Sequence, residues 1–203
     1  MKGLLLKDMI NMGKQTRSLL IIFFFYLVFA FFSEDRTIFG GIISIMMVMM
    51  VITSLAYDER AKWDRYALTM PLSRSQMVLS KYLLGLIFSA FAMLVNIALL
   101  SLFSPTPFGE VLILAFTFFG IGMFILAVLL PLMYHFGVEK GRMLMILVLF
   151  LPTAAILALS RAGINPPGED LMQALPYILP GVVVLTVGLS ILLSLRIYRG
   201  KEM

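Results

Sequence analysis

Six long stretches of the sequence contain no charged residue, and they limit the fold more than any other feature. They are Ser18–Phe32, Thr37–Tyr57, Tyr82–Ser104, Val111–Tyr134, Met143–Ser160 and Tyr177–Leu195. A helix needs about 20 mostly apolar residues to cross a bilayer, and the shortest stretch reaches that length with its flanks. If each stretch forms a helix, apolar residues lie around its whole circumference. A transmembrane strand would instead alternate apolar and polar residues along the chain. We therefore expect an all-α membrane protein, a single transmembrane domain of six helices over residues 1–203.

The composition leaves little room for other chemistry. Hydrophobic residues make up 61% of the 203 residues and charged residues 13%, about half the ~25% of a soluble domain. The sequence has no cysteine and one histidine, so we expect no disulfide, thiol nucleophile or metal site. It also lacks the Gly-x-x-x-x-Gly-Lys-[Ser/Thr] phosphate loop. We expect no catalytic residue; an intramembrane enzyme would need an acidic pair at the span edges, where Asp58 and Glu110 lie.

The basic residues between the stretches predict an orientation. Fourteen of them fall on one side: Lys2, Lys7, Lys14, Arg17, Arg60, Lys62, Arg65, Arg74, Lys81, Lys140, Arg142, Arg196, Arg199 and Lys201. Arg36 and Arg161 fall on the other. Because Lys and Arg are enriched on the cytoplasmic side of a membrane, we expect both termini to be cytoplasmic. These flanks also account for the net charge of +5, so no nucleic-acid partner is expected.

Residues 1–17 have the pattern of a short amphipathic helix. Leu5, Met9 and Met12 share one face, and Lys7 and Asp8 lie elsewhere. Such a helix lies in the plane of the membrane interface. The alternative is a charged flank that serves only to orient the first crossing.

The polar segment 58–81 is longer than a connector requires, with eight charges in 24 residues. Opposite charges four residues apart, at Asp58 and Lys62 and at Arg60 and Asp64, predict a helix over residues 59–68 that ends before Pro71. Ser73 and Gln76 form a capping box, which predicts a second helix that starts at Arg74. Trp, Tyr and Arg are enriched in protein interfaces, so the first helix is expected to contact a protein. The alternative is that Trp63 and Tyr66 lie among lipid head groups.

The apolar stretches carry few candidates for chemistry. They contain no Asp, Glu, Lys or Arg, which argues against an ion-driven carrier. Gly85, Ser89, Ala92 and Asn96 share one helix face, which either packs on another helix or contacts cargo. The methionines of the second stretch are adaptable contacts or ordinary apolar ones; they are Met46, Met47, Met49 and Met50. Three prolines inside the later stretches are candidate hinges: Pro131, Pro152 and Pro180.

Two segments carry a family resemblance. The sequence Lys-Gly-Leu-Leu-Leu-Lys-Asp (residues 2–8) leads into the first stretch, and residues 58–82 follow the second. Together they resemble the permease subunits of bacterial ABC-2 type transporters, in particular the small permeases of peptide exporters such as the phenol-soluble modulin exporter. The resemblance implies an N-terminal elbow helix, a multi-pass protein of the bacterial cell membrane, and two permeases, expected to be a homodimer, that enclose one pathway.

The resemblance also implies a partner. Each permease would carry an ABC ATPase subunit, which binds ATP and Mg, and residues 59–68 would be the coupling helix that docks on it. The residues implied in that contact are Glu59, Arg60, Lys62, Trp63, Asp64, Arg65 and Tyr66.

We therefore expect an ATP-driven exporter of apolar or amphipathic cargo, since no charge within the spans would compensate a buried charge. Peptides such as phenol-soluble modulins or antimicrobial peptides fit that description. The alternative is an ATP-independent channel, or an immunity or scaffold protein that sequesters peptides.

Overall fold

The computed structural model describes residues 2–32, 38–67, 69–103, 106–161 and 169–200. Every regular element in these residues is a helix, which confirms the all-α expectation. The helices are α1 (Lys2–Phe32), α2 (Ile38–Arg60), α3 (Trp63–Ala67), α4 (Arg74–Phe103), α5 (Phe108–Phe136), α6 (Val138–Arg161) and α7 (Glu169–Arg199).

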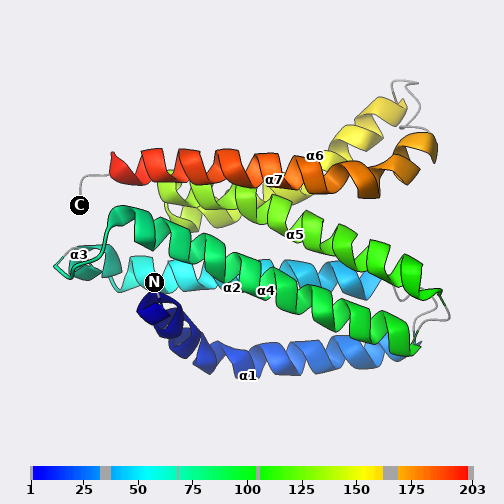
Figure 1. Ribbon diagram of the computed structural model, residues 1–203, viewed down its shortest axis with the longest axis horizontal. Helices are drawn as coiled ribbons and strands as arrows, with labels where there is room; N and C mark the ends of the chain where they lie inside the picture. The colour runs from blue at the N-terminus through cyan, green and yellow to red at the C-terminus, as the bar shows by residue number, and fades with distance from the viewer. Residues whose placement is uncertain (1, 33–37, 68, 104–105, 162–168, 201–203) are drawn as a thin grey trace.

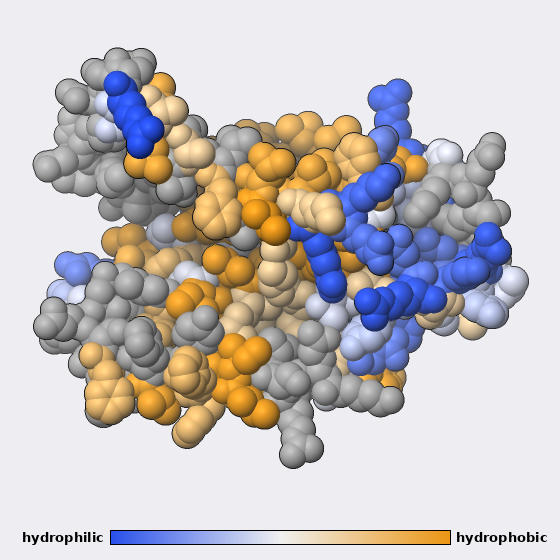
Figure 2. Space-filling model, turned by 180° about the vertical axis from the view of Figure 1, so that it is seen from behind, coloured by the Kyte–Doolittle hydropathy of each residue, from blue (hydrophilic) through white to orange (hydrophobic). Residues whose placement is uncertain are grey.

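The helices place the polar connections at one end of the bundle. Figure 1 shows that the start of α1, α3, the turn between α5 and α6 and the end of α7 all lie at the same end, here called the α3 end. Seen from behind in Figure 2, hydrophilic side chains gather there, while apolar side chains cover the middle of the molecule. The segments with most of the basic residues therefore share one end, as the charge pattern predicts.

Four helices are long and apolar enough to cross a membrane in the part of the chain that the structure describes. The segments are Phe39–Arg60, Arg74–Leu102, Phe108–Phe136 and Ile178–Arg199. Helices α4 and α7 start well before their apolar stretches, at Arg74 and Glu169. The predicted capping box is confirmed: the Gln76 amide donates to Ser73 Oγ over 3.2 Å, and the Ser73 amide donates to Gln76 Oε1 over 3.1 Å.

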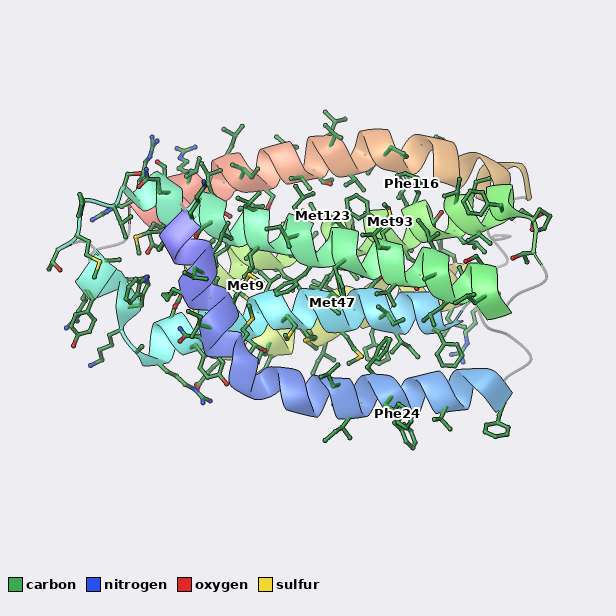
Figure 3. The ribbon with its side chains drawn as sticks, turned by 60° about the horizontal axis from the view of Figure 1, so that its bottom comes forward. Met9, Phe24, Met47, Met93, Phe116 and Met123 are labelled. Atoms are coloured by element: carbon green, nitrogen blue, oxygen red, sulfur yellow. The ribbon has the colours of Figure 1, made fainter. Side chains whose placement is uncertain are left out.

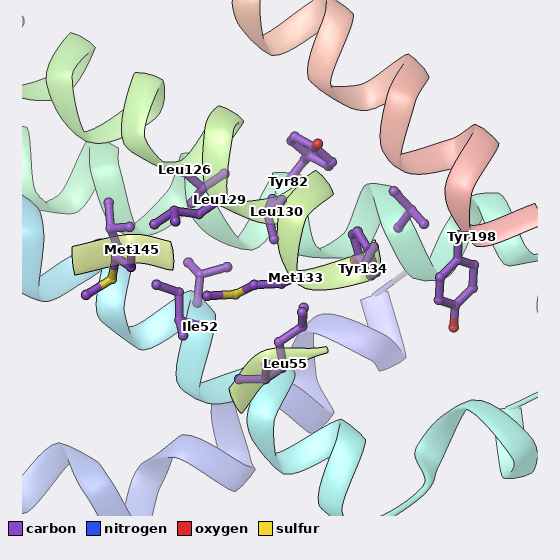
Figure 4. Packing of buried hydrophobic residues seen from close by; sticks show 14 of the residues in the cluster. Ile52, Leu55, Tyr82, Leu126, Leu129, Leu130, Met133, Tyr134, Met145 and Tyr198 are labelled. Carbon is purple, nitrogen blue, oxygen red and sulfur yellow. The ribbon is translucent and has the colours of Figure 1, made fainter. Parts of the chain in front are cut away.

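Helix α5 is the centre of the bundle, because it contacts α2, α4, α6 and α7. Its buried residues Leu126, Leu129, Leu130 and Met133 pack against α2, α4, α6 and α7 in one apolar cluster toward the α3 end (Figure 4). Close packing of this kind favours one arrangement of the helices over its neighbours. The apolar cluster therefore fixes the relative positions of the helix ends that lie near α3.

Helix α1 differs from the sequence prediction. It is continuous over Lys2–Phe32, and Figures 1 and 3 show that its first part crosses the neighbouring helices at an angle before α1 turns to run beside them. Leu4, Asp8 and Met12 form the buried face, while Met9 is 54% exposed. Met12, with Leu5 beside it, packs on Met50 of α2 and Leu84 of α4, and the placement of residues 1–17 in the membrane interface stays a prediction.

Candidate functional site

The helix predicted over residues 59–68 is interrupted. Helix α2 ends at Arg60, a turn follows, and α3 covers only Trp63–Ala67. Lys62 has a φ of +48° in the turn. This is a left-handed backbone conformation that residues with a Cβ rarely adopt. The continuous helix predicted from the charge spacing is therefore wrong within the described residues, and Leu68 lies outside them.

Four charged side chains from α1, α2 and α4 form a closed ring at the α3 end. Lys7 Nζ lies 3.0 Å from Asp8 Oδ1 and 2.5 Å from Asp58 Oδ1. Lys81 Nζ lies 2.8 Å from Asp8 Oδ2 and 2.6 Å from Asp58 Oδ2. Lys81 also donates to Ser54 Oγ over 2.7 Å. Each ammonium group thus touches both carboxylates, and the ring has no net charge.

Asp8 and Lys81 are buried, and the other two members of the ring are partly buried, which the sequence pattern did not predict. Asp8 is 1% exposed and Lys81 is 5% exposed. A buried charge is stable only when it is paired and hydrogen-bonded. Asp8 Oδ1 receives no hydrogen bond from the described residues, so its contact with Lys7 is ionic only. The sequence carried one signal: Lys7 and Asp8 stand side by side in a helix that is otherwise mostly apolar on its buried face.

Glu59 joins the end of α2 to the start of α6. Its Oε2 accepts a hydrogen bond from the Val138 amide over 2.7 Å, so the carboxylate occupies the positive end of the α6 helix dipole. Gly137, just before α6, has a φ of +83°, and a Cβ there would lie 2.9 Å from Glu59 Oε1. The close approach of the carboxylate therefore depends on a glycine at 137.

Two further contacts tie α3 to the bundle. The Tyr198 hydroxyl donates to Asp64 Oδ1 over 2.8 Å, and the Tyr198 ring packs edge-on against Tyr134 with 5.4 Å between centroids. Lys7 Nζ lies 4.4 Å above the centre of the Trp63 ring, within the range of a cation–π contact. Helix α3 is therefore fastened to α1 through Trp63 and to α7 through Asp64.

The other predicted contact residues face away from the bundle. Arg60, Lys62 and Arg65 are exposed, and Tyr66 is 62% exposed. The seven residues implied by the resemblance thus fall into two groups. Glu59, Trp63 and Asp64 contact α6, α1 and α7, whereas the other four side chains form no hydrogen bond or ion pair with the described residues.

A small cavity of about 50 Å³ lies between α3 and the bundle. Its walls include Lys7, Asp58, Trp63, Asp64 and Tyr198. The walls combine these polar groups with apolar side chains such as Leu55 and Met133, and this volume suits a few water molecules. The described residues contain no group of three or more histidine or acidic side chains that could hold a metal ion.

The small and polar stripe of α4 lies inside the bundle. Ser89 and Asn96 are buried, and Asn96 Nδ2 donates to the Gly40 carbonyl over 3.3 Å. A Cβ at Gly85 would lie 2.5 Å from a methyl of Leu126. In this arrangement the stripe packs α4 against α2 and α5.

A polar network that the sequence analysis missed links α4 to α7. The Tyr82 hydroxyl lies 2.6 Å from Ser190 Oγ and 2.8 Å from Ser194 Oγ, and Ser190 also donates to the Ala127 carbonyl. Because each of these groups has a partner, the network costs little to bury and fixes the relative position of three helices.

The methionine and proline candidates lie within helices. Met50 is buried against α1 and α4, and Met46 is half-buried. Helices α5, α6 and α7 continue through Pro131, Pro152 and Pro180. Their proposed hinge role stays a prediction.

The comparisons with known proteins give one match. A family model described as ABC-2 family transporter protein matches residues 3–199. No curated protein and no solved structure matches the chain.

Proposed function

Since the chain belongs to the ABC-2 family of transporter proteins, as a permease subunit of an ABC transporter, we propose that it exports apolar or amphipathic cargo with energy from a separate ATPase subunit. Export is the direction of the peptide exporters that residues 2–8 and 58–82 resemble. ATP and Mg would bind to that subunit and not to this chain.

The proposed topology has six crossings in one transmembrane domain of a bacterial cell membrane, made by α1, α2, α4, α5, α6 and α7. Four of these contain the apolar segments long enough to cross, and α1 and α6 have 31 and 24 residues. A helix rises about 1.5 Å per residue, so α6 reaches across a hydrocarbon core of about 30 Å. The part of α1 after the elbow, Ser18–Phe32, rises about 22 Å and needs its flanks to cross. Both termini and α3 would be cytoplasmic, and the first part of α1 would be the elbow helix.

The observation that carries the energy-coupling proposal is the position of α3. It lies at the end of the bundle (Figure 1) and is tied to α1 and α7 through Trp63 and Asp64. A movement of α3 would therefore pull on two helices at once. We propose that the segment 58–81 is the coupling loop, on which an ATPase subunit docks.

The cargo proposal rests on the charge distribution. In the described residues the buried ion pairs lie in the ring at the α3 end, and the middle of the bundle is apolar apart from small polar groups such as Asn96 and Ser190. A charge would be costly to carry through such a region. Amphipathic peptides such as phenol-soluble modulins or antimicrobial peptides fit, moved by two identical permeases with two ATPase subunits.

The test is transport by the full complex in inverted membrane vesicles. We expect a fluorescent amphipathic helical peptide to accumulate inside the vesicles with ATP, and to stay outside with a non-hydrolysable ATP analogue. The control is a complex whose ATPase lacks its phosphate-loop lysine. Equal accumulation without ATP hydrolysis would contradict an ATP-driven exporter and support a channel or a sequestering protein.

A further inference from the structure

Helix α7 is the least covered of the four helices with an apolar segment long enough to cross a membrane. Figure 1 shows it along the outer edge of the bundle, with its last turn at the α3 end. Of its most apolar part 17% is buried, against 56% for α2. Its inner face makes the contacts described above, through Ser190, Ser194 and Tyr198. The opposite face of α7 is open to the surroundings of the protein.

Five residues on this outer face form a straight stripe, here called the α7 stripe. Their positions advance by four and three residues in turn, so they share one side of the helix. The stripe consists of Leu185, Leu189, Leu192, Arg196 and Arg199. The three leucines are 68%, 61% and 66% exposed, and both arginines are exposed. The stripe is therefore apolar along its length and doubly positive at its end.

The positive charge at the end of the stripe is not neutralised by the described part of the chain. Arg196 and Arg199 lie in the last turn of α7, and the ion pairs of the described residues involve other side chains. A third arginine comes from α4, because Arg74 Nη1 donates to the Arg199 carbonyl over 2.6 Å. Three arginines from two helices therefore converge at the α3 end of α7.

The stripe has the length of one half of a bilayer. Eleven positions separate Leu185 from Arg196, a rise of about 16 Å. Half of a hydrocarbon core of about 30 Å is about 15 Å. Arg196 comes directly after the apolar stretch that ends at Leu195. When Arg196 lies at the level of the lipid phosphates, Leu185 therefore lies near the middle of the bilayer.

We propose that the α7 stripe binds one anionic phospholipid, with an acyl chain along the three leucines and the phosphate between Arg196 and Arg199. Arg74 adds a further positive charge from α4. Guanidinium groups bind phosphate through charge-assisted hydrogen bonds, often two at once. Basic residues clustered directly outside a membrane helix attract anionic lipids. The inference depends neither on the cargo nor on the ATPase subunit.

The charge of the stripe favours a lipid over a second copy of this chain. In a two-fold pair the same surface of both copies meets. Two copies with the same orientation in the membrane would have parallel α7 helices, so Arg196 and Arg199 would face the arginines of the other copy. Like charges placed opposite each other oppose binding, whereas a phosphate neutralises them.

The experiment measures lipid binding to the purified full chain in detergent, by native mass spectrometry during titration with phosphatidylglycerol or phosphatidylcholine. The variant is R196Q/R199Q. The matched control is K140Q/R142Q, which removes the same charge from exposed residues at the start of α6, at the same end of the bundle. A second variant, R196K/R199K, keeps the charge and removes the planar donors. Thermal unfolding without added lipid checks that each variant is folded.

We expect the wild type to bind phosphatidylglycerol about tenfold more tightly than phosphatidylcholine, and R196Q/R199Q to lose about tenfold of that affinity. K140Q/R142Q should lose less than about twofold, and R196K/R199K should fall between the two. Glycerol phosphate, which carries the phosphate without acyl chains, should not compete at the concentration of the lipid.

Three results would overturn the inference while leaving the proposed function intact. Equal losses in R196Q/R199Q and K140Q/R142Q, or equal binding of the two lipids by the wild type, would assign the binding to the general positive charge of this end. Competition by glycerol phosphate would leave a site for free phosphate only. Stronger self-association of R196Q/R199Q with unchanged lipid binding would assign the stripe to a second copy of the chain.

Discussion

The buried charge ring makes the strongest prediction about stability. In Asp8→Asn, Lys81 keeps Asp58 at 2.6 Å and Ser54 at 2.7 Å but loses the carboxylate at 2.8 Å. That Coulomb attraction is about 6 kcal/mol at an effective dielectric constant of about 20. The neutral side chain also avoids the cost of burying a charge and the repulsion from Asp58. We therefore expect a net loss of about 3 kcal/mol, the lower end for a broken buried pair.

The assay is thermal unfolding of the purified chain in detergent. For a chain of this length about 1 kcal/mol corresponds to about 2–4 °C, so Asp8→Asn should lower Tm by about 6–12 °C. Lys81→Met should lower it at least as much, because it leaves two carboxylates facing one lysine. Lys62→Met is the matched control: Lys62 is exposed, and its loss should change Tm by less than about 2 °C.

The double variant Asp8→Asn with Lys81→Met separates a charge ring from simple packing. It leaves Lys7 and Asp58, a neutral pair at 2.5 Å. Because each single variant leaves an unbalanced charge and the double variant does not, the double should lose at least about 2 kcal/mol less than the sum of the singles. Additive losses, or a Tm for Asp8→Asn equal to that of the wild type, would refute the account of a coupled buried ring.

Three smaller predictions follow from the contacts around α3 and α4. Gly137→Ala should lower the free energy of unfolding by about 1–3 kcal/mol in a chemical denaturation series, because its φ of +83° excludes a Cβ and Glu59 lies close; an unchanged midpoint would contradict this. Tyr198→Phe, which removes the bond to Asp64, should cost about 1 kcal/mol and reduce the cargo moved per ATP hydrolysed, measured by paired transport and ATPase assays. Asn96→Leu should cost about 1 kcal/mol, because it removes the hydrogen bond from α4 to the Gly40 carbonyl of α2, and a gain in Tm would argue that Asn96 serves the cargo and not the packing.

Much of the fold was predictable from local sequence. The helix start at Arg74 follows from a capping box whose two hydrogen bonds involve residues three positions apart, Ser73 and Gln76. The gathering of the basic segments at one end follows from the spacing of the apolar stretches. These features depend on neighbours in the chain, so they can be read without knowing which helices meet.

The candidate site was only partly predictable. Residues 58–81 were singled out correctly as the polar segment with aromatic residues at the α3 end, but the continuous helix was not found. Helical spacing pairs Asp58 with Lys62, yet Asp58 binds Lys7 and Lys81 instead. Those partners are 51 and 23 positions away in the sequence, so the pattern of neighbouring residues does not predict these contacts.

The sequence by itself determined that this chain is helical, apolar along its length and basic at one end, because hydropathy and charge act on each segment separately. Only the tertiary structure decided which charges are inside. Asp8 and Lys81 are buried because three helices converge there and supply opposite charges, whereas Arg60 and Arg65, on either side of the turn at Lys62, stay exposed. The sequence of a single helix does not show which of its charges will be buried, because the energy of burying a charge depends on the groups that other helices bring to it.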